Sequence, residues 1–283
     1  MPQLMSLEAV DYLVIGHITC DVIPGGLRLG GSAAYAALTA RAMGLRVGVV
    51  TAWADEIPLT GFEGITVVSA PAQHATRFEN IATSRGRAQV IHHVAPKIDF
   101  ALVPEAWRRA RIIHLAPVAQ EVEPVLPPDF RPTLLGLTPQ GWLRTWDAEG
   151  RVRPCAWPDA EKALRAAGAA VLSVEDVQHQ EEIIEHMVLA SRLLVVTEGA
   201  AGARLYWNHD LRRFRAPAST EVDPTGAGDI FAASFFVRLL ATRDPWEAAR
   251  FANQVAALSV TRPGLAGVPT PEEVQACLVE VIH

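Results

Sequence analysis

Short apolar segments rich in β-branched residues alternate along the chain with segments of helical composition. Strands are expected at 12–18, 47–51, 112–115, 133–137, 170–173 and 193–197. Helices are expected at 32–43, 159–167 and 180–190. Strand, helix, strand at this spacing is typical of a mostly parallel sheet with helices on both faces. The sequence therefore predicts an α/β fold. Ser32 is the expected N-cap of the first helix and Gly44 follows its end.

Three regions depart from this alternation. Residues 21–29 form a brief excursion that contains Pro24-Gly25-Gly26. Residues 77–93 alternate around Ser84-Arg85-Gly86, which predicts a β-hairpin. The hairpin is either a cover over a site or an edge hairpin, and the pattern does not separate the two. Residues 125–157, rich in Pro and Trp, predict loops around one strand.

Composition limits the protein class. The chain has 283 residues, of which 50% are hydrophobic and 20% charged, so it is not a disordered chain. This length suits one large domain or two small ones. The net charge of −6 argues against nonspecific nucleic-acid binding, which depends on Lys and Arg contacts to phosphates. The short basic cluster at 212–215 is interpreted as a solvated strand end or loop.

The location of the protein is expected to be cytoplasmic. No uninterrupted apolar stretch is long enough for a membrane helix, and the N-terminus has no basic segment or cleavage site of a signal peptide. The 3 cysteines, Cys20, Cys155 and Cys277, are far apart, which fits neither a disulfide framework nor a zinc site. Cys20 is interpreted as a small buried residue.

The segment most informative about chemistry is Asp223-Pro-Thr-Gly-Ala-Gly-Asp229, which precedes an apolar run of helical length. Gly226 and Gly228 let backbone N–H groups approach a ligand closely. A helix N-terminus adds unpaired N–H groups and partial positive charge, so the segment predicts an anion site. Asp229 would lie beside the anion, either as a general base or only as a helix cap.

Two other nucleotide sites are disfavoured by absent sequence patterns. No G-x-G-x-x-G follows the first expected strand, so a dinucleotide-binding oxidoreductase is a weak interpretation. No G-x-x-x-x-G-K-[ST] segment occurs, so a P-loop kinase is disfavoured as well.

The string D-P-T-G-A-G-D-I-F resembles the C-terminal signature of the ribokinase-like, or phosphofructokinase B, sugar kinases. The usual form is D-T-x-G-A-G-D-x-F, and here Pro224 stands in place of the Thr. Gly30-Gly31 and the following helix resemble the N-terminal di-glycine motif of that family. The resemblance covers nearly the whole chain. It implies one domain over 1–283, a three-layer α/β/α sandwich, with a reduced β lid from about 20–30 and 76–95.

The resemblance also implies the reaction, which is transfer of the ATP γ-phosphoryl group to an alcohol. Asp229 would be the base, and the backbone of Gly226, Ala227 and Gly228 would be the anion hole. Magnesium would be bound mainly by phosphates and water. Glu175 and Asp176 match only loosely the family residues near the metal, and a solvated acidic loop explains them equally well. Many family members also use a monovalent cation such as K⁺, which the sequence leaves open.

The acceptor is expected to be a sugar, an inositol-like polyol or a nucleoside. Asp21 matches the acidic residue that binds substrate hydroxyls, with Gly30 and Gly31 beside it. Tyr35 replaces an Asn that commonly contacts the sugar, so it either contacts a different substrate or only packs beneath the lid. The implied nucleotide-binding residues are Thr197, Gly199, Gly202, Thr225 and Asn253.

Several other residues have competing interpretations. His114 lines a substrate pocket or is a structural, hydrogen-bonded residue. Adjacent His92 and His93 point to opposite faces of a strand and so do not chelate one ion readily. Trp53 is a candidate for the substrate region. The alternative function is a catalytically inactive nucleotide- or sugar-binding protein of the same fold. The expected partners are the small-molecule substrates, with no nucleic acid and no membrane, in a monomer or a homodimer.

Overall fold

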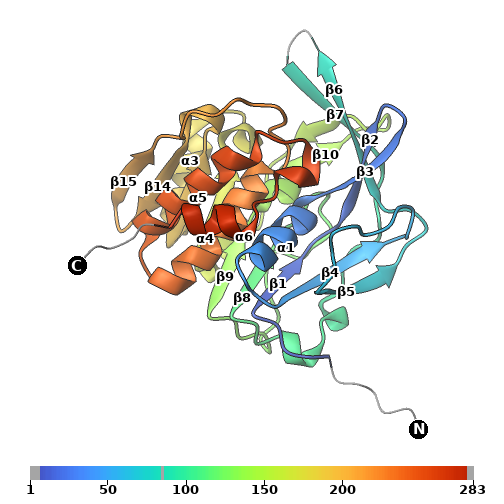
Figure 1. The fold of residues 1–283 in the computed structure, drawn as a ribbon, viewed down its shortest axis with the longest axis horizontal. Helices are drawn as coiled ribbons and strands as arrows, with labels where there is room; N and C mark the ends of the chain where they lie inside the picture. The colour runs from blue at the N-terminus through green and yellow to red at the C-terminus, as the bar shows by residue number, and fades with distance from the viewer. Residues whose placement is uncertain (1–6, 84–85, 279–283) are drawn as a thin grey trace.

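The computed structural model describes residues 7–83 and 86–278. Within these residues the main sheet has the strand order β15-β14-β13-β12-β9-β8-β1-β4-β5 (Figure 1). Its strands are β1 (Tyr12–Ile15), β4 (Val47–Trp53), β5 (Ile65–Pro71), β8 (Ile112–Leu115), β9 (Leu134–Leu137), β12 (Ala169–Ser173), β13 (Leu193–Thr197), β14 (Ala203–Trp207) and β15 (Asp210–Phe214). Pairing is parallel from β5 to β13 and antiparallel for β14 and β15.

Helices cover both faces of this sheet. They are α1 (Ser32–Ala42), α2 (Ala160–Ala166), α3 (Glu181–Ala190), α4 (Ala227–Thr242), α5 (Pro245–Ser259) and α6 (Pro271–Ala276). Alternate residues of β1 belong to separate cores: Tyr12 and Val14 pack with α1 and α4, and Leu13 and Ile15 pack on the side of α2 and α3. The predicted α/β sandwich is therefore confirmed.

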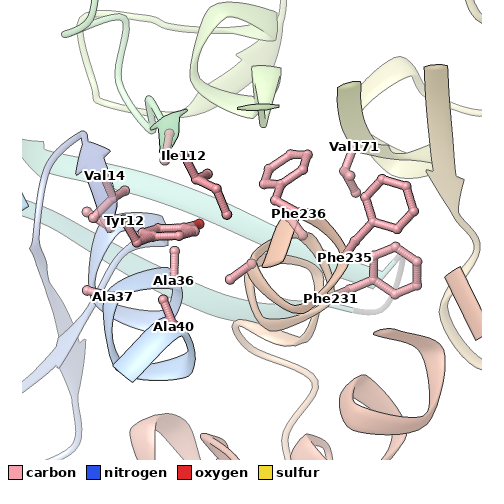
Figure 2. Packing of buried hydrophobic residues seen from close by; sticks show 14 of the residues in the cluster. Tyr12, Val14, Ala36, Ala37, Ala40, Ile112, Val171, Phe231, Phe235 and Phe236 are labelled. Carbon is pink, nitrogen blue, oxygen red and sulfur yellow. The ribbon is translucent and has the colours of Figure 1, made fainter. Parts of the chain in front are cut away.

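Helix α4 is held against the sheet by its aromatic residues, which places the start of this helix. Figure 2 shows Phe231, Phe235 and Phe236 projecting from α4 toward the sheet. A Cβ atom at Gly136 of β9 would lie 2.6 Å from the ring of Phe236, so the glycine makes room for this ring. All three rings are buried, and burial of an aromatic ring contributes about 1.5–3 kcal/mol.

A second sheet lies beside the main one, with the strand order β3-β2-β6-β7. Its strands are β2 (Thr19–Ile23), β3 (Gly26–Gly30), β6 (Thr76–Thr83) and β7 (Gly86–His93), and β6 and β7 project from the body of the molecule (Figure 1). The predicted hairpin at 77–93 is present as β6 and β7, although its turn at 84–85 lies outside the described residues.

The connections between the two sheets meet at the buried side chain of His17. Its Nδ1 lies 2.7 Å from the hydroxyl of Thr76, and its Nε2 lies 3.0 Å from the carbonyl oxygen of Pro96. The fully buried carboxylate of Glu121 accepts hydrogen bonds from the backbone N–H groups of His17, Val118 and Ala119. These contacts join β1, β6 and the segment after β7 at one point, which fixes the base of the second sheet.

Some expected boundaries were wrong. The first strand ends at Ile15 instead of residue 18, and the chain then passes so close to Ala116 that a Cβ atom on Gly16 would lie 2.2 Å from its backbone. The N-cap of α1 is Gly31 and not Ser32, which is the first helical residue. Gly44 follows the helix with a positive φ of 84°, as its position predicted.

The segment 125–157 is more ordered than its composition indicated. Besides the expected strand it contains the antiparallel ribbon of β10 (Arg144–Trp146) and β11 (Val152–Pro154). Strands of three residues are too short to show alternation in the sequence. Among the described residues, no helix is long and apolar enough to span a membrane.

Candidate active site

A cavity of about 1340 Å³ lies where the second sheet, the β10–β11 ribbon and the ends of several main-sheet strands meet. From the second sheet it is lined by Asp21, Phe78, Asn80, Gln89 and Val90, and from the ribbon by Arg144, Arg151, Val152, Arg153 and Pro154. The main sheet contributes Thr138, Ser173 and Thr197, and the loop before α4 contributes residues 224–229. The cavity therefore collects residues from segments far apart in the sequence.

The loop before α4 is organised by the carboxylate of Asp223. Its Oδ1 accepts a hydrogen bond from Thr225 N–H at 2.9 Å, and its Oδ2 accepts one from Gly264 N–H at 3.0 Å. Burial raises the pKa of Asp223, but these hydrogen bonds outweigh it and lower the pKa overall. The first carboxylate of the 223–229 segment thus shapes the loop and connects it to the segment at Gly264.

The two glycines of this segment have different surroundings. Gly226 has a φ of +82°, and a Cβ atom there would lie 2.3 Å from the ring of Tyr35. A Cβ atom on Gly228 would meet nothing within 4 Å, so this side of the backbone is open. Both glycines and Ala227 line the cavity at the N-terminus of α4, although the Ala227 N–H also donates to the Pro224 carbonyl at 3.2 Å. Backbone N–H groups at a helix N-terminus that lines a cavity can bind an anion.

Asp229 lies in the first turn of α4, half-buried at the same wall of the cavity. Loss of water contacts raises its pKa to about 6, while a hydrogen bond with Ser32 and the charge of Arg144 oppose this rise. The charge of Asp176 raises the pKa further. A carboxylate with a pKa near 6 is ionised at neutral pH and accepts a proton more readily than an ordinary aspartate. The general-base interpretation is thus compatible with the site, and helix position alone does not explain its surroundings.

Arg144 and Ser32 were not identified from the sequence as neighbours of Asp229. Arg144 is one arginine within a Pro- and Trp-rich segment, and no pattern marks it. Ser32 was assigned to helix capping because it precedes an Ala-rich helix. Only the three-dimensional arrangement brings the β10 strand and the start of α1 to the carboxylate.

Asp21 and Gly31 line another part of the cavity wall, whereas Gly30 is not among the described residues that line it. Asp21 lies in β2 and is buried, and a Cβ atom on Gly30 would lie 2.9 Å from its Oδ2. Gly31 has a φ of +92°, and a Cβ atom there would lie 2.8 Å from the carbonyl oxygen of His17. Gly30 therefore leaves room for the Asp21 carboxylate, and Gly31 lets the start of α1 approach the backbone at His17.

Tyr35 packs beneath this wall. It is 1% exposed, its ring contacts the backbone of Gly226, and it belongs to a core cluster that includes Ile230 and Phe251. Tyr35 is among the residues that line the cavity, and its buried hydroxyl has no hydrogen-bond partner within the part of the chain that the structure describes. Burial raises the pKa of this hydroxyl. The ring has a packing role. The hydroxyl, which has no partner in the described structure, is able to form a hydrogen bond with a ligand.

The second sheet adds cavity residues that sequence reasoning missed. The side-chain amide of Gln89 donates to Oδ1 of Asn80 at 3.0 Å, and both residues line the cavity with Phe78. The alternation of the hairpin predicted two faces. It did not show which face would meet the cavity, because that depends on how β6 pairs with β2.

The predicted nucleotide residues lie together along the cavity. They are Thr197, Gly199, Gly202, Thr225 and Asn253. The side-chain amide of Asn253 donates to the carbonyl oxygens of Phe214 and Arg215 at 3.3 and 2.7 Å, so it holds the segment after β15. A Cβ atom on Gly202 would lie 1.8 Å from the Phe214 carbonyl oxygen, which explains the glycine there.

Glu175 and Asp176 also line the cavity. Asp176 accepts hydrogen bonds from Ser173 N–H at 2.9 Å and from the Gln140 side chain at 3.3 Å. No group of three or more metal-ligating side chains occurs in 7–83 and 86–278. These two carboxylates therefore supply at most a partial set of metal ligands.

Other candidates from the sequence lie elsewhere. His114 is fully buried, with its ring nitrogens 2.8 Å from the Tyr12 hydroxyl and 2.9 Å from the Thr138 hydroxyl, and burial lowers its pKa to about 3. It is a structural residue. Trp53 is not among the described residues that line the cavity. His92 pairs with Glu79.

Comparison with known proteins agrees with this architecture. Residues 156–272 match the pfkB family carbohydrate kinases. A cytidine kinase from Thermococcus kodakarensis is 29% identical over 254 residues, which cover 80% of this chain and 87% of that protein. An inositol 3-kinase from Zea mays is 32% identical over 139 residues, which cover 48% of this chain and 36% of that protein.

Solved structures show the same fold at low identity. A pyrophosphate-dependent kinase of the ribokinase family, solved with sulfate, has a TM-score of 0.80 and 20% identity, covering 94% of this chain and 99% of that chain. Arabidopsis thaliana ribokinase, complexed with ribose and ATP, has a TM-score of 0.70 and 16% identity, covering 95% and 98%. Residues 156–272 thus match the pfkB family of carbohydrate kinases, most of the chain is similar to a named kinase, and the chain has the fold of ribokinase-family structures.

Proposed function

We propose that the protein transfers the γ-phosphoryl group of ATP to a hydroxyl of a small, neutral, polyhydroxylated acceptor. The observation that supports this most strongly is the pairing of Asp229 with the N-terminus of α4. A half-buried carboxylate, with its pKa raised to about 6, lies next to the backbone of Gly226 and Gly228 at one wall of the cavity. A base and an anion site side by side are the two groups that phosphoryl transfer to an alcohol requires.

In the proposed step, the acceptor hydroxyl gives its proton to the carboxylate of Asp229. The acceptor oxygen forms a bond to the γ-phosphorus while the bond between that phosphorus and the β,γ-bridging oxygen breaks, and ADP leaves. Negative charge on the transferring group would face the first N–H groups of α4. Loss of one such preorganised donor typically costs about 3–4 kcal/mol of transition-state stabilisation.

The wall on the acceptor side indicates the class of acceptor. The Asp21 carboxylate can accept hydrogen bonds from hydroxyl groups, and the amides of Asn80 and Gln89 can both donate and accept. A second carboxylate, Asp229, faces the same space. These groups suit hydroxyls, and the compounds named for two relatives, cytidine and inositol, carry no charge at neutral pH, so we infer a neutral sugar, an inositol-like polyol or a nucleoside.

The donor would lie along Thr197, Gly199, Gly202 and Thr225, with its phosphates directed to the loop before α4. Magnesium, when bound, would neutralise phosphate charge. The partial donor set of Asp176 and Glu175 fits an ion held mostly by phosphates and water. Assays with and without K⁺ test whether a monovalent cation also contributes.

A matrix of donors and acceptors tests this proposal. The donors are ATP and pyrophosphate, since one structural neighbour is a pyrophosphate-dependent kinase. The acceptors are myo-inositol, cytidine, ribose and fructose, with formation of a phosphomonoester followed by ³¹P NMR. We expect product with ATP and magnesium and at least one acceptor. Binding of ATP without product from any acceptor would favour the alternative, a catalytically inactive nucleotide- or sugar-binding protein.

A further inference from the structure

Arg28 connects the two walls of the cavity, although neither its position nor its type marks it in the sequence. It lies in β3, directly opposite Asp21 of β2 in the antiparallel pairing. Its Nη2 lies 3.8 Å from Oδ2 of Asp21. Directly opposed, oppositely charged residues are a stabilising cross-strand pair.

The same guanidinium reaches the loop before α4. Its Nη1 donates to Oδ2 of Asp223 at 3.3 Å. The Asp223 carboxylate also accepts the N–H groups of Thr225 and Gly264. Arg28 therefore ends on the carboxylate that shapes the anion loop, 195 residues further along the chain.

The segment at Gly264 is shaped to receive this side chain. A Cβ atom on Gly264 would lie 3.1–3.2 Å from the Cδ, Cζ and Nε atoms of Arg28. Gly264 also has a φ of +51°, which disfavours other residues. The guanidinium thus lies against the backbone of Gly264, between the carboxylates of Asp21 and Asp223. A side chain at position 264 would crowd it.

We propose that Arg28 is a positioning residue that fastens the second sheet to the anion loop, so that the acceptor wall and the donor wall are held as one unit. The guanidinium neutralises two carboxylates that would otherwise repel each other across the cavity wall. Its planar fork allows contacts with both, whereas a lysine ammonium is a point charge that would favour one of them. Arg28 does not touch the reacting atoms in this proposal.

The consequence is a coupling between the two substrates, which rests on the proposed function. An acceptor bound at Asp21 would favour the arrangement of the second sheet that Arg28 ties to Asp223. A donor bound at the anion loop would favour the same arrangement from the other side. By linkage, each substrate would then tighten the binding of the other by the same factor.

Hydrogen exchange, measured without any ligand, tests whether Arg28 fastens the second sheet to the anion loop. Arg28→Lys and Asp223→Asn should each speed exchange of the amides of β2 and β3 about tenfold, and the double variant should add little because both remove one interaction. Arg46→Lys is the matched control, since Arg46 pairs with Asp11 at an exposed site. Circular dichroism and Tm confirm folding of each variant. An unchanged exchange rate in Arg28→Lys would contradict this role of Arg28. Fully additive effects of the two substitutions in the double variant would contradict it as well.

Steady-state kinetics test the coupling. Initial rates are measured over a matrix of MgATP and whichever of myo-inositol, cytidine, ribose and fructose the protein phosphorylates. In the wild-type protein and in Arg46→Lys, saturation with MgATP should lower the acceptor KM about tenfold, and in Arg28→Lys this factor should fall toward one. An unchanged factor would show that Arg28 is only structural. Absence of turnover in the wild-type protein would refute the proposed function and, with it, the coupling between the substrates. The hydrogen-exchange result would still decide whether Arg28 fastens the second sheet to the anion loop.

Discussion

The proposed donor wall and the proposed acceptor wall of the cavity are built in different ways. The donor wall is mostly backbone: the loop at 223–226, the first turn of α4 and the glycines at 199 and 202. The acceptor wall consists of side chains from β2, β6, β7 and β10, which are far apart in the sequence. A backbone wall depends on glycines and turn geometry, and a side-chain wall depends on residue identity.

This difference separates the chemistry from the choice of substrate. Backbone N–H groups bind any phosphate, so the donor wall can serve every acceptor. The amides and the aromatic ring of Asn80, Gln89 and Phe78 can change without disturbing the loop before α4. Loop substitutions should therefore impair all substrates alike, and substitutions in the second sheet should change acceptor preference.

Asp229→Asn should have the largest effect. Loss of a general base lowers kcat by about 10²–10⁴-fold for every acceptor. The folded-state pKa of about 6 lies above the ordinary aspartate value of 3.8, so the contribution of this group to stability is fully present below pH 3.8 and is lost as pH rises through 6. Asn removes the buried charge, so the variant should melt at or above the wild-type Tm at pH 8, with no gain below pH 3.8. The N-cap of α4 is Gly226, without a side-chain capping hydrogen bond, so wild-type turnover in the variant would show that Asp229 is not the base rather than that it caps the helix.

The two loop glycines should respond differently to the same methyl group. Gly226→Ala places Ala at a φ of +82° against the ring of Tyr35, and should cost about 1–3 kcal/mol of unfolding free energy. Gly228→Ala meets open space within α4 and should change stability by less than about 1 kcal/mol. Both should lower kcat, because each adds a methyl group at the anion site. Urea unfolding and initial rates measure the two effects. Equal stabilities would contradict the described packing, and full activity of Gly228→Ala would argue against the anion hole.

Substitutions of the cavity-lining amides of β6 and β7 should alter acceptor binding only. Asn80→Leu and Gln89→Leu each remove a polar group and should raise the acceptor KM about tenfold, with the donor KM unchanged. Glu79→Gln is a suitable control, because Glu79 pairs with His92 on the surface of the same hairpin. Equal increases in both KM values would mean that the two walls are not separable in this way.

Tyr35→Phe should have the smallest effect and decides between its two interpretations. The hydroxyl is buried without a partner in the described structure, so its removal should leave stability unchanged or raise it by up to about 1 kcal/mol. We expect an unchanged acceptor KM, since the residue is 1% exposed. A raised acceptor KM would assign the hydroxyl to substrate binding.

The sequence indicated the proposed donor wall far more clearly than the proposed acceptor wall. The segment 223–229 is contiguous, and its glycines, helix start and carboxylate are adjacent in the chain, so local rules were enough. Asn80, Gln89 and Arg144 approach the cavity only through strand pairing between distant segments. Arg28 joins residues 21 and 223, a relation that no local pattern contains.

The pH dependence of kcat/KM of the wild-type protein tests the central claim most directly. If Asp229 must be ionised to accept the proton, kcat/KM for the acceptor at saturating MgATP should be constant from pH 8 down to about 6 and then fall about tenfold per pH unit. The residual rate of Asp229→Asn should lack this fall. A wild-type rate that stays constant down to pH 5, or a variant with the same acid limb, would contradict the assignment of Asp229 as the base.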